Sequence, residues 1–218
     1  MNETVLPGFK GRQEAGRLLA SFLLGMVDEE EAIILALPRG GVPVAAEISK
    51  VLGKPFDVLI VRKLGVPGHE EFAMGAIAAG GVRVLDENIV SQLGLSRSEV
   101  DSVIQRETRE LERREHLYRG TLDRPDVAGR TVIVVDDGVA TGSTMSAAIR
   151  LLRGRQVERI IVAVPVAPRD TVERLREEAD EVVVALEPEP FGAVGQWYED
   201  FSQTSDDEVQ ALLRGGPS

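Results

Sequence analysis

Two adjacent aspartates, Asp136 and Asp137, follow a run of four β-branched residues and precede a loop of small residues. The run, residues 132–135, is typical of a central parallel strand that is covered on both faces. The aspartates therefore fall at the carboxyl end of a strand, which is where open α/β sheets bind their ligands. Carboxylates at this position can accept hydrogen bonds from the hydroxyl groups of a polyol.

The loop after the aspartates, residues 138–144, lacks bulky side chains and includes three hydroxyl groups. Its backbone N–H groups can close around an anion, and the helix predicted to follow directs its positive end at the same point. A phosphate in the loop and a polyol at the aspartates form the simplest ligand that suits both halves. The alternative is that the aspartates and the glycine turn only cap the helix.

Nine consecutive residues resemble the motif with which type I phosphoribosyltransferases bind 5-phosphoribosyl-1-pyrophosphate (PRPP): Asp136, Asp137, Gly138, Val139, Ala140, Thr141, Gly142, Ser143 and Thr144. The resemblance implies that the paired acids hydrogen-bond the ribose hydroxyls during catalysis and that the loop holds the 5-phosphate. It also makes the two aspartates the candidate ligands of a Mg²⁺ ion.

A second short loop, residues 37–41, reads Leu-Pro-Arg-Gly-Gly between a predicted strand and a predicted helix. The two glycines permit a close approach of the backbone, and Arg39 adds a cation with planar donors. The resemblance implies that Arg39, Gly40 and Gly41 bind the pyrophosphate group, and that this loop can contain a cis peptide bond. Taken alone, such a turn is common between a strand and a helix.

Arg62 and Lys63 end the next predicted strand and open a long segment, residues 64–81, that contains five glycines. So extended a connection is typical of a functional lid or of disorder. The resemblance implies a mobile loop that closes over the substrates, with basic residues near its start on the pyrophosphate. We assign this leaving-group role to Lys63 first and to Arg62 second; the alternative is that both are surface cations.

Strands and helices that could position these loops alternate along the chain. Apolar spacing predicts strands at residues 32–37, 58–61, 131–136, 160–166 and 182–186, and helices at residues 12–27, 43–52, 143–153 and 169–178. This order predicts an α/β fold with a doubly wound, mainly parallel sheet flanked by helices. The resemblance implies the same fold with a small hood or flap.

We expect one core domain over residues 1–188, which includes a flexible loop at 63–81 and a charged helix at 96–119, followed by a C-terminal aromatic flap at 189–218. The charged helix opens with a possible capping box, Ser96 with Glu99. We expect it to be an outer element or a lid support.

The C-terminal segment gathers four of the nine aromatic residues of the chain: Phe191, Trp197, Tyr198 and Phe201. Such a cluster could stack on a planar acceptor, with Trp197 as the candidate contact. It could equally pin the C-terminus to the core. The sequence leaves both interpretations open.

The composition excludes several classes of protein. The formal net charge of -11 opposes binding to nucleic acid, which requires a basic footprint, although a few clustered cations can still hold a small anion. The chain contains no cysteine, begins without a signal-peptide pattern and has no apolar stretch approaching 18 residues. We therefore expect a cytoplasmic protein without membrane or nucleic-acid partners. Assembly into a homo-oligomer is compatible with the sequence.

The predicted function is the Mg²⁺-dependent transfer of 5-phosphoribose from PRPP to a nitrogenous base or a related planar acceptor, with release of pyrophosphate. Ala140 stands where hypoxanthine/guanine-type members carry a third acid, so the acceptor stays unassigned. Most of the chain is similar to a group of predicted bacterial phosphoribosyltransferases whose acceptor is unassigned. A PRPP-binding regulatory protein is the main alternative. A magnesium phosphohydrolase is disfavoured, because such enzymes usually require a second acid at the position that Gly138 occupies.

Overall fold

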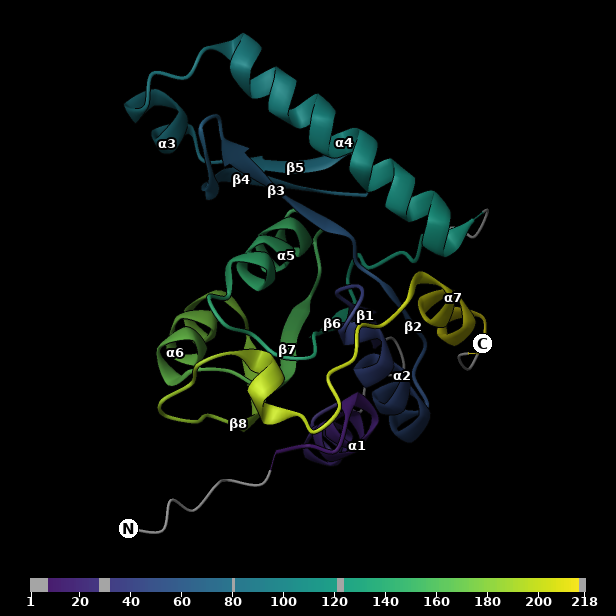
Figure 1. Cartoon of the computed structure of the whole chain (residues 1–218). Coiled ribbons are helices and arrows are strands. Elements are labelled where there is room, and N and C mark those ends of the chain that lie inside the picture. The colour runs from purple at the N-terminus through teal and green to yellow at the C-terminus, as the bar shows by residue number, and fades with distance from the viewer. Residues whose placement is uncertain (1–7, 28–31, 80, 121–123, 216–218) are drawn as a thin grey trace.

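A five-stranded parallel sheet forms the centre of the computed structural model, which describes residues 8–27, 32–79, 81–120 and 124–215 (Figure 1). The strands lie in the order β2-β1-β6-β7-β8. Their bounds are Ile33–Ala36 for β1, Phe56–Val58 for β2, Thr131–Val135 for β6, Arg159–Val166 for β7 and Glu181–Leu186 for β8. All residues of β1 and β6 are buried, as the apolar runs within them predicted.

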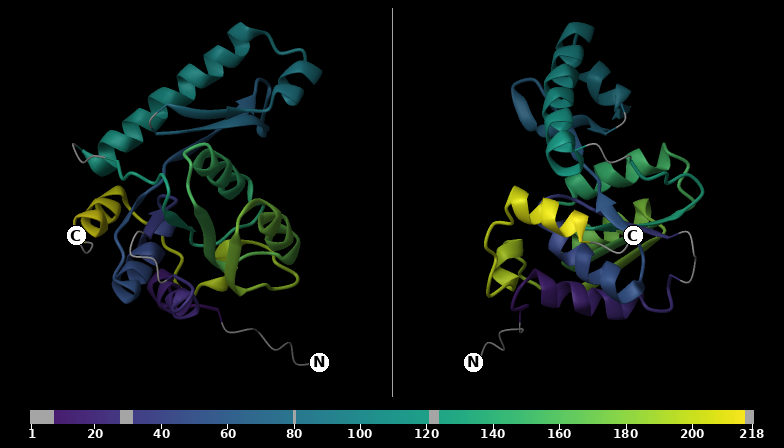
Figure 2. Two further views of the ribbon diagram at one scale, coloured as in Figure 1. Left: turned by 180° about the vertical axis from the view of Figure 1, so that it is seen from behind. Right: turned by 90° about the vertical axis from the view of Figure 1, so that its right-hand side faces the viewer.

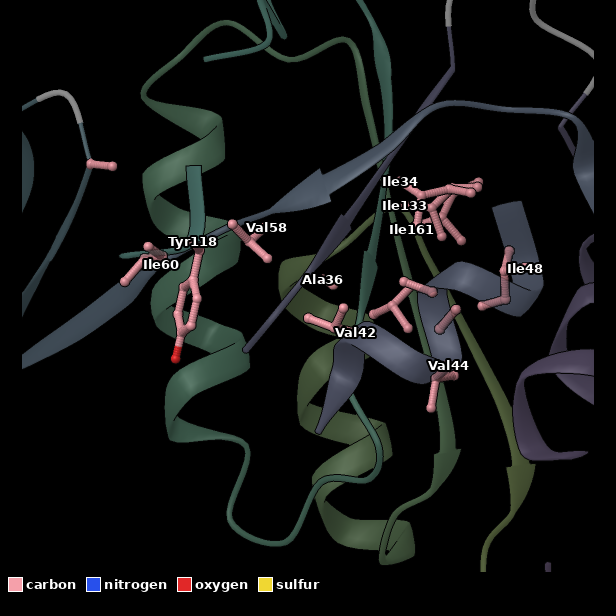
Figure 3. Close-up of a cluster of buried hydrophobic side chains, with 14 of the residues drawn as sticks. Ile34, Ala36, Val42, Val44, Ile48, Val58, Ile60, Tyr118, Ile133 and Ile161 are labelled. Atoms are coloured by element: carbon pink, nitrogen blue, oxygen red, sulfur yellow. The ribbon is translucent and has the colours of Figure 1, made fainter. Parts of the chain in front are cut away.

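Helices cover both faces of this sheet. On one face, α1 (Arg12–Leu23) and α2 (Gly41–Leu52) pack against side chains such as Ile34 and Ile133 (Figure 3). On the other face lie α5 (Ser143–Arg153) and α6 (Arg169–Glu178). Because successive side chains of a strand point to opposite faces, strands such as β1 and β6 contribute to the apolar core on both sides of the sheet. The predicted doubly wound fold is confirmed.

A second layer, which we call the hood, is inserted between β2 and β6 and stands apart from the central sheet (Figures 1 and 2). It consists of an antiparallel sheet in the order β3-β4-β5 and two helices. Their bounds are Val61–Val66 for β3, His69–Ala78 for β4, Val82–Leu85 for β5, Glu87–Gln92 for α3 and Arg97–Arg119 for α4. The predicted capping box of Ser96 with Glu99 opens α4.

The segment predicted to be a flexible loop, 63–81, is not a loop, because most of its described residues form the β3–β4 hairpin; its flexibility stays a prediction. Gly75 lies within β4, where a Cβ would come 2.3 Å from the carbonyl oxygen of Val84 on β5. This glycine allows two strands to approach closely rather than marking a loop. The predicted strand at 58–61 is also shifted, since it spans the end of β2 and the start of β3.

The C-terminal segment returns to the core and forms a 3-10 helix, η1 (Val194–Trp197), and a last helix, α7 (Asp206–Arg214). Phe9 and Tyr198 pair as an isolated parallel bridge, which joins the N-terminal segment to the C-terminal one. Helix α7 packs against α2 and α4. Among the described helices, none combines the length and the apolarity that crossing a membrane requires.

Candidate active site

The two loops singled out in the sequence begin side by side, at the carboxyl ends of neighbouring strands. Ala36 of β1 is paired with Val135 of β6, so the residues that follow each strand emerge together. The backbone N–H of Leu37 donates to the carbonyl of Val135 at 2.8 Å, which continues the pairing by one step. The parallel register thus brings residues about one hundred positions apart into one site.

Two glycines allow these loops to touch. A Cβ on Gly40 would lie 1.9 Å from Oδ2 of Asp137, and a Cβ on Gly41 would lie 2.6 Å from the carbonyl oxygen of Val135. Both distances are far shorter than a van der Waals contact, so a side chain at Gly40 would displace the Asp137 carboxylate, and one at Gly41 would push the loop backbones apart. The peptide bond between Pro38 and Arg39 is cis, as the resemblance implied.

Asp137 is held by Arg12, for which the sequence gives no local sign, and by Tyr198 of the C-terminal aromatic cluster. Nε of Arg12, in the first turn of α1, lies 2.7 Å from Oδ2 of Asp137, and both side chains are largely buried. The phenolic hydroxyl of Tyr198 donates to the backbone carbonyl of Asp137. Nη1 of Arg12 also donates to the carbonyl of Ser202 at 2.8 Å, and its guanidinium lies 4.1 Å from the ring centre of Phe201.

Asp136 faces a different environment from its neighbour. Its Oδ1 accepts a hydrogen bond from the backbone N–H of Asp137 at 2.8 Å. Burial of the carboxyl group, together with the negative charge of Asp137, raises the pKa of Asp136 well above its ordinary value. Among the described residues, an arginine forms an ion pair with Asp137 but not with Asp136, so the two acids are chemically distinct.

The phosphate-loop candidate, residues 138–144, is anchored from behind by β7 and α6. The backbone N–H of Val139 donates to the carbonyl of Val166 at 2.9 Å. Side chains of α6 bind two loop carbonyls, with Thr171 on Ala140 at 2.8 Å and Arg174 on Thr141 at 2.5 Å. Since a trans peptide points its N–H opposite to its carbonyl, the N–H groups that follow these carbonyls point away from α6.

The start of α5 completes this loop. Gly142 precedes the helix with a φ of 73°, a left-handed conformation that favours glycine. Ser143 and Thr144 form the first turn, whose backbone N–H groups have no intrahelical partners. Within the described chain no side chain caps this end of α5, so the turn is suited to an anion.

Arg39 of the pyrophosphate-loop candidate reaches toward the C-terminal helix. Its Nη1 lies 3.7 Å from Oδ1 of Asp206 in the first turn of α7. The same carboxylate oxygen accepts a hydrogen bond of 2.8 Å from the hydroxyl of Tyr118 on α4. Burial and this bond to Asp206 raise the pKa of Tyr118 to about 12. No local pattern in the sequence indicates this junction of loop, hood and C-terminal helix.

The two basic residues of β3 separate in the structure. Nε and Nη2 of Arg62 lie 2.9 and 2.5 Å from Oε2 of the buried Glu107 on α4, so Arg62 fastens the hood sheet to its helix. Lys63 instead lines a cavity together with Thr141 and Ser143 of the phosphate-loop candidate. Lys63 is therefore near one of the predicted subsites, whereas Arg62 is engaged within the hood.

The aromatic residues of the C-terminal segment pack on one another and on the N-terminal segment. The ring centres of Phe9 and Tyr198 are 5.4 Å apart, and those of Tyr198 and Phe201 are 5.1 Å apart. Nε1 of Trp197 donates to the carbonyl of Phe191 at 3.1 Å. This arrangement favours the interpretation that the cluster pins the C-terminus, while a contact of Trp197 with substrate stays a prediction.

Among the described residues, no three or more His, Cys, Asp or Glu side chains gather as a metal site. Asp136 and Asp137 are a pair, and one oxygen of Asp137 is already bound to Arg12. The protein alone thus offers a divalent cation few oxygen ligands here. Oxygen atoms of a bound diphosphate and water would have to supply the others.

Known proteins resemble this chain over most of its length. The family pattern for the phosphoribosyl transferase domain matches residues 3–195. Two curated relatives from Mycobacterium tuberculosis, of strains CDC 1551 / Oshkosh and ATCC 25618 / H37Rv, are provisionally named phosphoribosyl transferases. Each is 46% identical over 205 residues, which cover 94% of this chain but 46% of the relative. The chain thus spans about half the length of these relatives.

The solved structure of the protein TT1426 from Thermus thermophilus has 41% sequence identity and a TM-score of 0.87, with 94% of this chain and 97% of that chain covered. So high a score over nearly the whole of both chains extends the likeness to the hood as well as the central sheet. Since the family pattern spans residues 3–195, the chain belongs to the phosphoribosyl transferase domain family.

Proposed function

We propose that this chain transfers 5-phosphoribose from PRPP to a nitrogenous acceptor and releases pyrophosphate. The observation that carries the proposal is the contact between the two loops, where Gly40 leaves just enough room for the carboxylate of Asp137. The middle of a sugar phosphate bound at this contact would meet carboxylates, which can accept hydrogen bonds from hydroxyl groups. Its two ends would meet N–H groups or cations. PRPP has the matching order of groups: a phosphate, a ribose with free hydroxyls, and a diphosphate.

Each part of the substrate has a candidate partner. Residues 138–144 and the first turn of α5 would hold the 5-phosphate, and Asp136 and Asp137 would accept hydrogen bonds from the ribose hydroxyls. Arg39 and the backbone at residues 38–41 would bind the diphosphate, for which Arg39 would exchange its 3.7 Å ion pair with Asp206. Lys63 would approach from the hood.

In the proposed reaction the acceptor nitrogen forms a bond to the anomeric carbon while the bond from that carbon to the diphosphate oxygen breaks. The electron pair leaves with pyrophosphate, and the acceptor nitrogen loses a proton. Positive charge develops on the sugar, which the carboxylate of Asp137 would stabilise once Arg12 and Tyr198 hold it in place. Ala140 has no group that could accept this proton, so the proton would pass to water.

Asp136 and Asp137 would supply only a small part of the oxygen ligands that a Mg²⁺ ion needs. Asp136 and Asp137 are the residues that would contact the ion, directly or through water, and Mg²⁺ commonly keeps several waters beside one or two carboxylates. Bound with the substrate, the ion would neutralise charge on the departing diphosphate. Fixing the ribose and the 5-phosphate would remain the work of the protein.

Incubation with PRPP, Mg²⁺ and a panel of nitrogenous bases tests the proposal, with pyrophosphate and nucleotide measured together. We expect both products to appear in equal amounts with at least one base. PRPP binding without release would favour the regulatory alternative. Two observations support that alternative: Arg62 is paired with Glu107, and Arg39 is paired with Asp206. The absence of both binding and release would contradict the two functions alike.

A further inference from the structure

A cavity of about 550 Å³ lies beside α5, between the β3–β4 hairpin of the hood and helix α6. We call it the flank cavity. It touches the outer side of the phosphate-loop candidate but includes neither the acid pair nor Arg39. The residues that matter for its chemistry are Lys63, Phe72, Thr141, Ser143, Arg150 and Arg174.

The flank cavity gathers three cationic side chains, Lys63, Arg150 and Arg174, that make no ion pair with the described residues. Among the described side chains, no carboxylate lies within ion-pair distance of Lys63, Arg150 or Arg174, although the chain carries 36 acidic residues against 25 basic ones. Elsewhere most arginines are paired, as Arg113 and Arg114 are with Glu110. Unpaired cations that face one hollow in an acidic protein favour an anionic ligand.

The remaining contacts of these cations leave donors available. Among the described residues Arg150 makes one hydrogen bond, a long one of 3.4 Å from Nε to the carbonyl of Ser146. Arg174 uses Nη2 for Thr141 and Thr171, and its guanidinium has further N–H groups. The carboxylate in the lining, that of Glu178, accepts a hydrogen bond from Ser146 at 2.9 Å.

An apolar surface completes the cavity. Phe72 on β4 is 52% exposed although it is a large aromatic residue, and it stands on the hood side opposite the arginines of α5 and α6. A ring of this kind can stack on a planar group, while the cations hold phosphates. The hydroxyls of Thr141 and Ser143, 3.0 Å apart, add further polar contacts.

We propose that the flank cavity binds an oligophosphate anion, either a free polyphosphate or the phosphate chain of a nucleotide whose base lies on Phe72. Such a ligand would contact the hood through Lys63 and the core through Arg150 and Arg174. It would therefore bridge two layers of the molecule and hold the hairpin against α5. This site borders the proposed PRPP site and shares Lys63, Thr141 and Ser143 with it, whereas Phe72, Arg150 and Arg174 belong to the flank cavity alone.

Calorimetric titration with sodium tripolyphosphate tests this proposal. The variant Arg150→Gln removes one unpaired cation of the cavity. Arg109→Gln is the matched control, because Arg109 is an exposed arginine of α4 that forms no ion pair within the described part of the chain. One charge-assisted hydrogen bond is worth enough to weaken binding about tenfold. We expect that loss in Arg150→Gln, an affinity within about twofold of wild type in Arg109→Gln, and unchanged PRPP binding in both.

Hydrogen exchange locates the ligand, because tripolyphosphate could also occupy the pyrophosphate loop. We expect added protection in peptides that cover residues 72–76 and 172–178. Protection confined to residues 38–41 and 138–144, or equal affinity in wild type and Arg150→Gln, would overturn the proposal. Tighter binding of ATP than of tripolyphosphate, lost in Phe72→Ala, would identify a nucleotide; equal binding would identify a free polyphosphate.

Discussion

Arg12 and Asp137 form the most constrained pair of side chains in the candidate site. The arginine is held by three groups besides the aspartate: the carbonyl of Ser202 and the rings of Phe201 and Tyr198. Because its position is fixed, it fixes one oxygen of Asp137 as well. The carboxylate is thus oriented before any ligand arrives, which lowers the cost of binding.

Arg12→Gln should weaken PRPP binding roughly tenfold to a hundredfold, since it removes a charge-assisted hydrogen bond from a largely buried carboxylate. Arg17→Gln, on the same helix, is the control because the Arg17 side chain is 55% exposed and pairs with Glu47 rather than with Asp137. Calorimetry with PRPP measures both variants. Equal affinities in the two would show that Arg12 does not position Asp137.

Gly40→Ala should abolish PRPP binding while leaving the fold intact. The φ of Gly40 is -60°, which alanine adopts readily, so the effect must come from the clash of the new methyl group with Asp137. Gly154→Ala is the matched control, because its Cβ would come no closer than 3.4 Å to Leu151. Thermal unfolding and PRPP titration separate stability from binding; tight binding by Gly40→Ala would refute the loop contact.

At the residue scale, the sequence predicts contacts that are local and misses those that are distant. Asp136, Asp137 and residues 138–144 form one continuous motif, so their types and order were enough to place them on a strand, a loop and a helix. Arg12 lies 125 positions from Asp137 and Tyr198 lies 61 positions from it. A single arginine in an amphipathic helix carries no local sign of such a partner.

The elements that form the site divide into a rigid base and an inserted hood. Strands β1 and β6 are buried along their whole length, and their loops start in register. Within the hood, the contact of Arg62 on β3 with Glu107 joins the sheet to the long helix α4, and the Glu107 side chain is 9% exposed. Burial acts to raise the pKa of Glu107, but hydrogen bonds from Arg106 and Arg62 outweigh it and hold the pKa below its ordinary value.

Glu107→Gln should destabilise the hood by about 1–3 kcal/mol, because two arginines lose a buried, charged partner. Glu110→Gln is the control: Glu110 also pairs with two arginines, but nearer to solvent, where ion pairs contribute less. Hydrogen exchange of residues 61–66 and 100–111 reports the difference. Equal exchange in both variants would mean that the Arg62 contact does not fasten the hood.

At the scale of elements, the sequence predicts the strands with long apolar runs. It does not predict the strands that contain glycines, because glycine usually indicates a turn or a loop. The strands at residues 131–135, 159–166 and 181–186 lie close to their predicted ranges. The β3–β4 hairpin was missed because Gly75 reports a close approach of β5, a contact that only the folded sheet reveals. The charged helix predicted at 96–119 is present as α4, whereas the segment predicted as a loop before it forms strands.

The whole molecule carries only two tyrosines, and both have raised pKa values. Burial and the contact with Asp206 raise the pKa of Tyr118 to about 12, and burial with the charge of Asp137 raises that of Tyr198 further. A folded-state pKa above the unfolded value contributes stability below about pH 10, which is lost as the pH rises through the folded pKa. The fold should therefore weaken in alkali.

Spectrophotometric titration measures this directly. The native chain should show no phenolate absorbance near about pH 10, whereas the chain unfolded in urea should titrate both tyrosines there. Absorbance in the native protein should rise only near pH 12, together with unfolding. A native tyrosine that titrates at its ordinary pKa would contradict the burial of Tyr118 beside Asp206 or of Tyr198 beside Asp137.

At this largest scale the sequence predicted the class of fold and the family, because alternating elements and one specific motif determine both. It did not predict that the segment around Phe9 meets the segment around Tyr198 at the site. Phe9 donates to and accepts from the segment around Tyr198, with N···O distances of 2.8 Å, and so brings Arg12 to Asp137. That closure depends on the path of the whole chain and on no single element.

A crystal structure of the protein with PRPP and Mg²⁺ tests the central claim most directly. We predict that the 5-phosphate lies in the loop of residues 138–144, that the ribose hydroxyls bind Asp137, and that the diphosphate lies over residues 38–41. The same soak of Asp137→Asn should give little or no density for the sugar. Clear PRPP density away from both loops, or equal occupancy in the variant, would contradict the account.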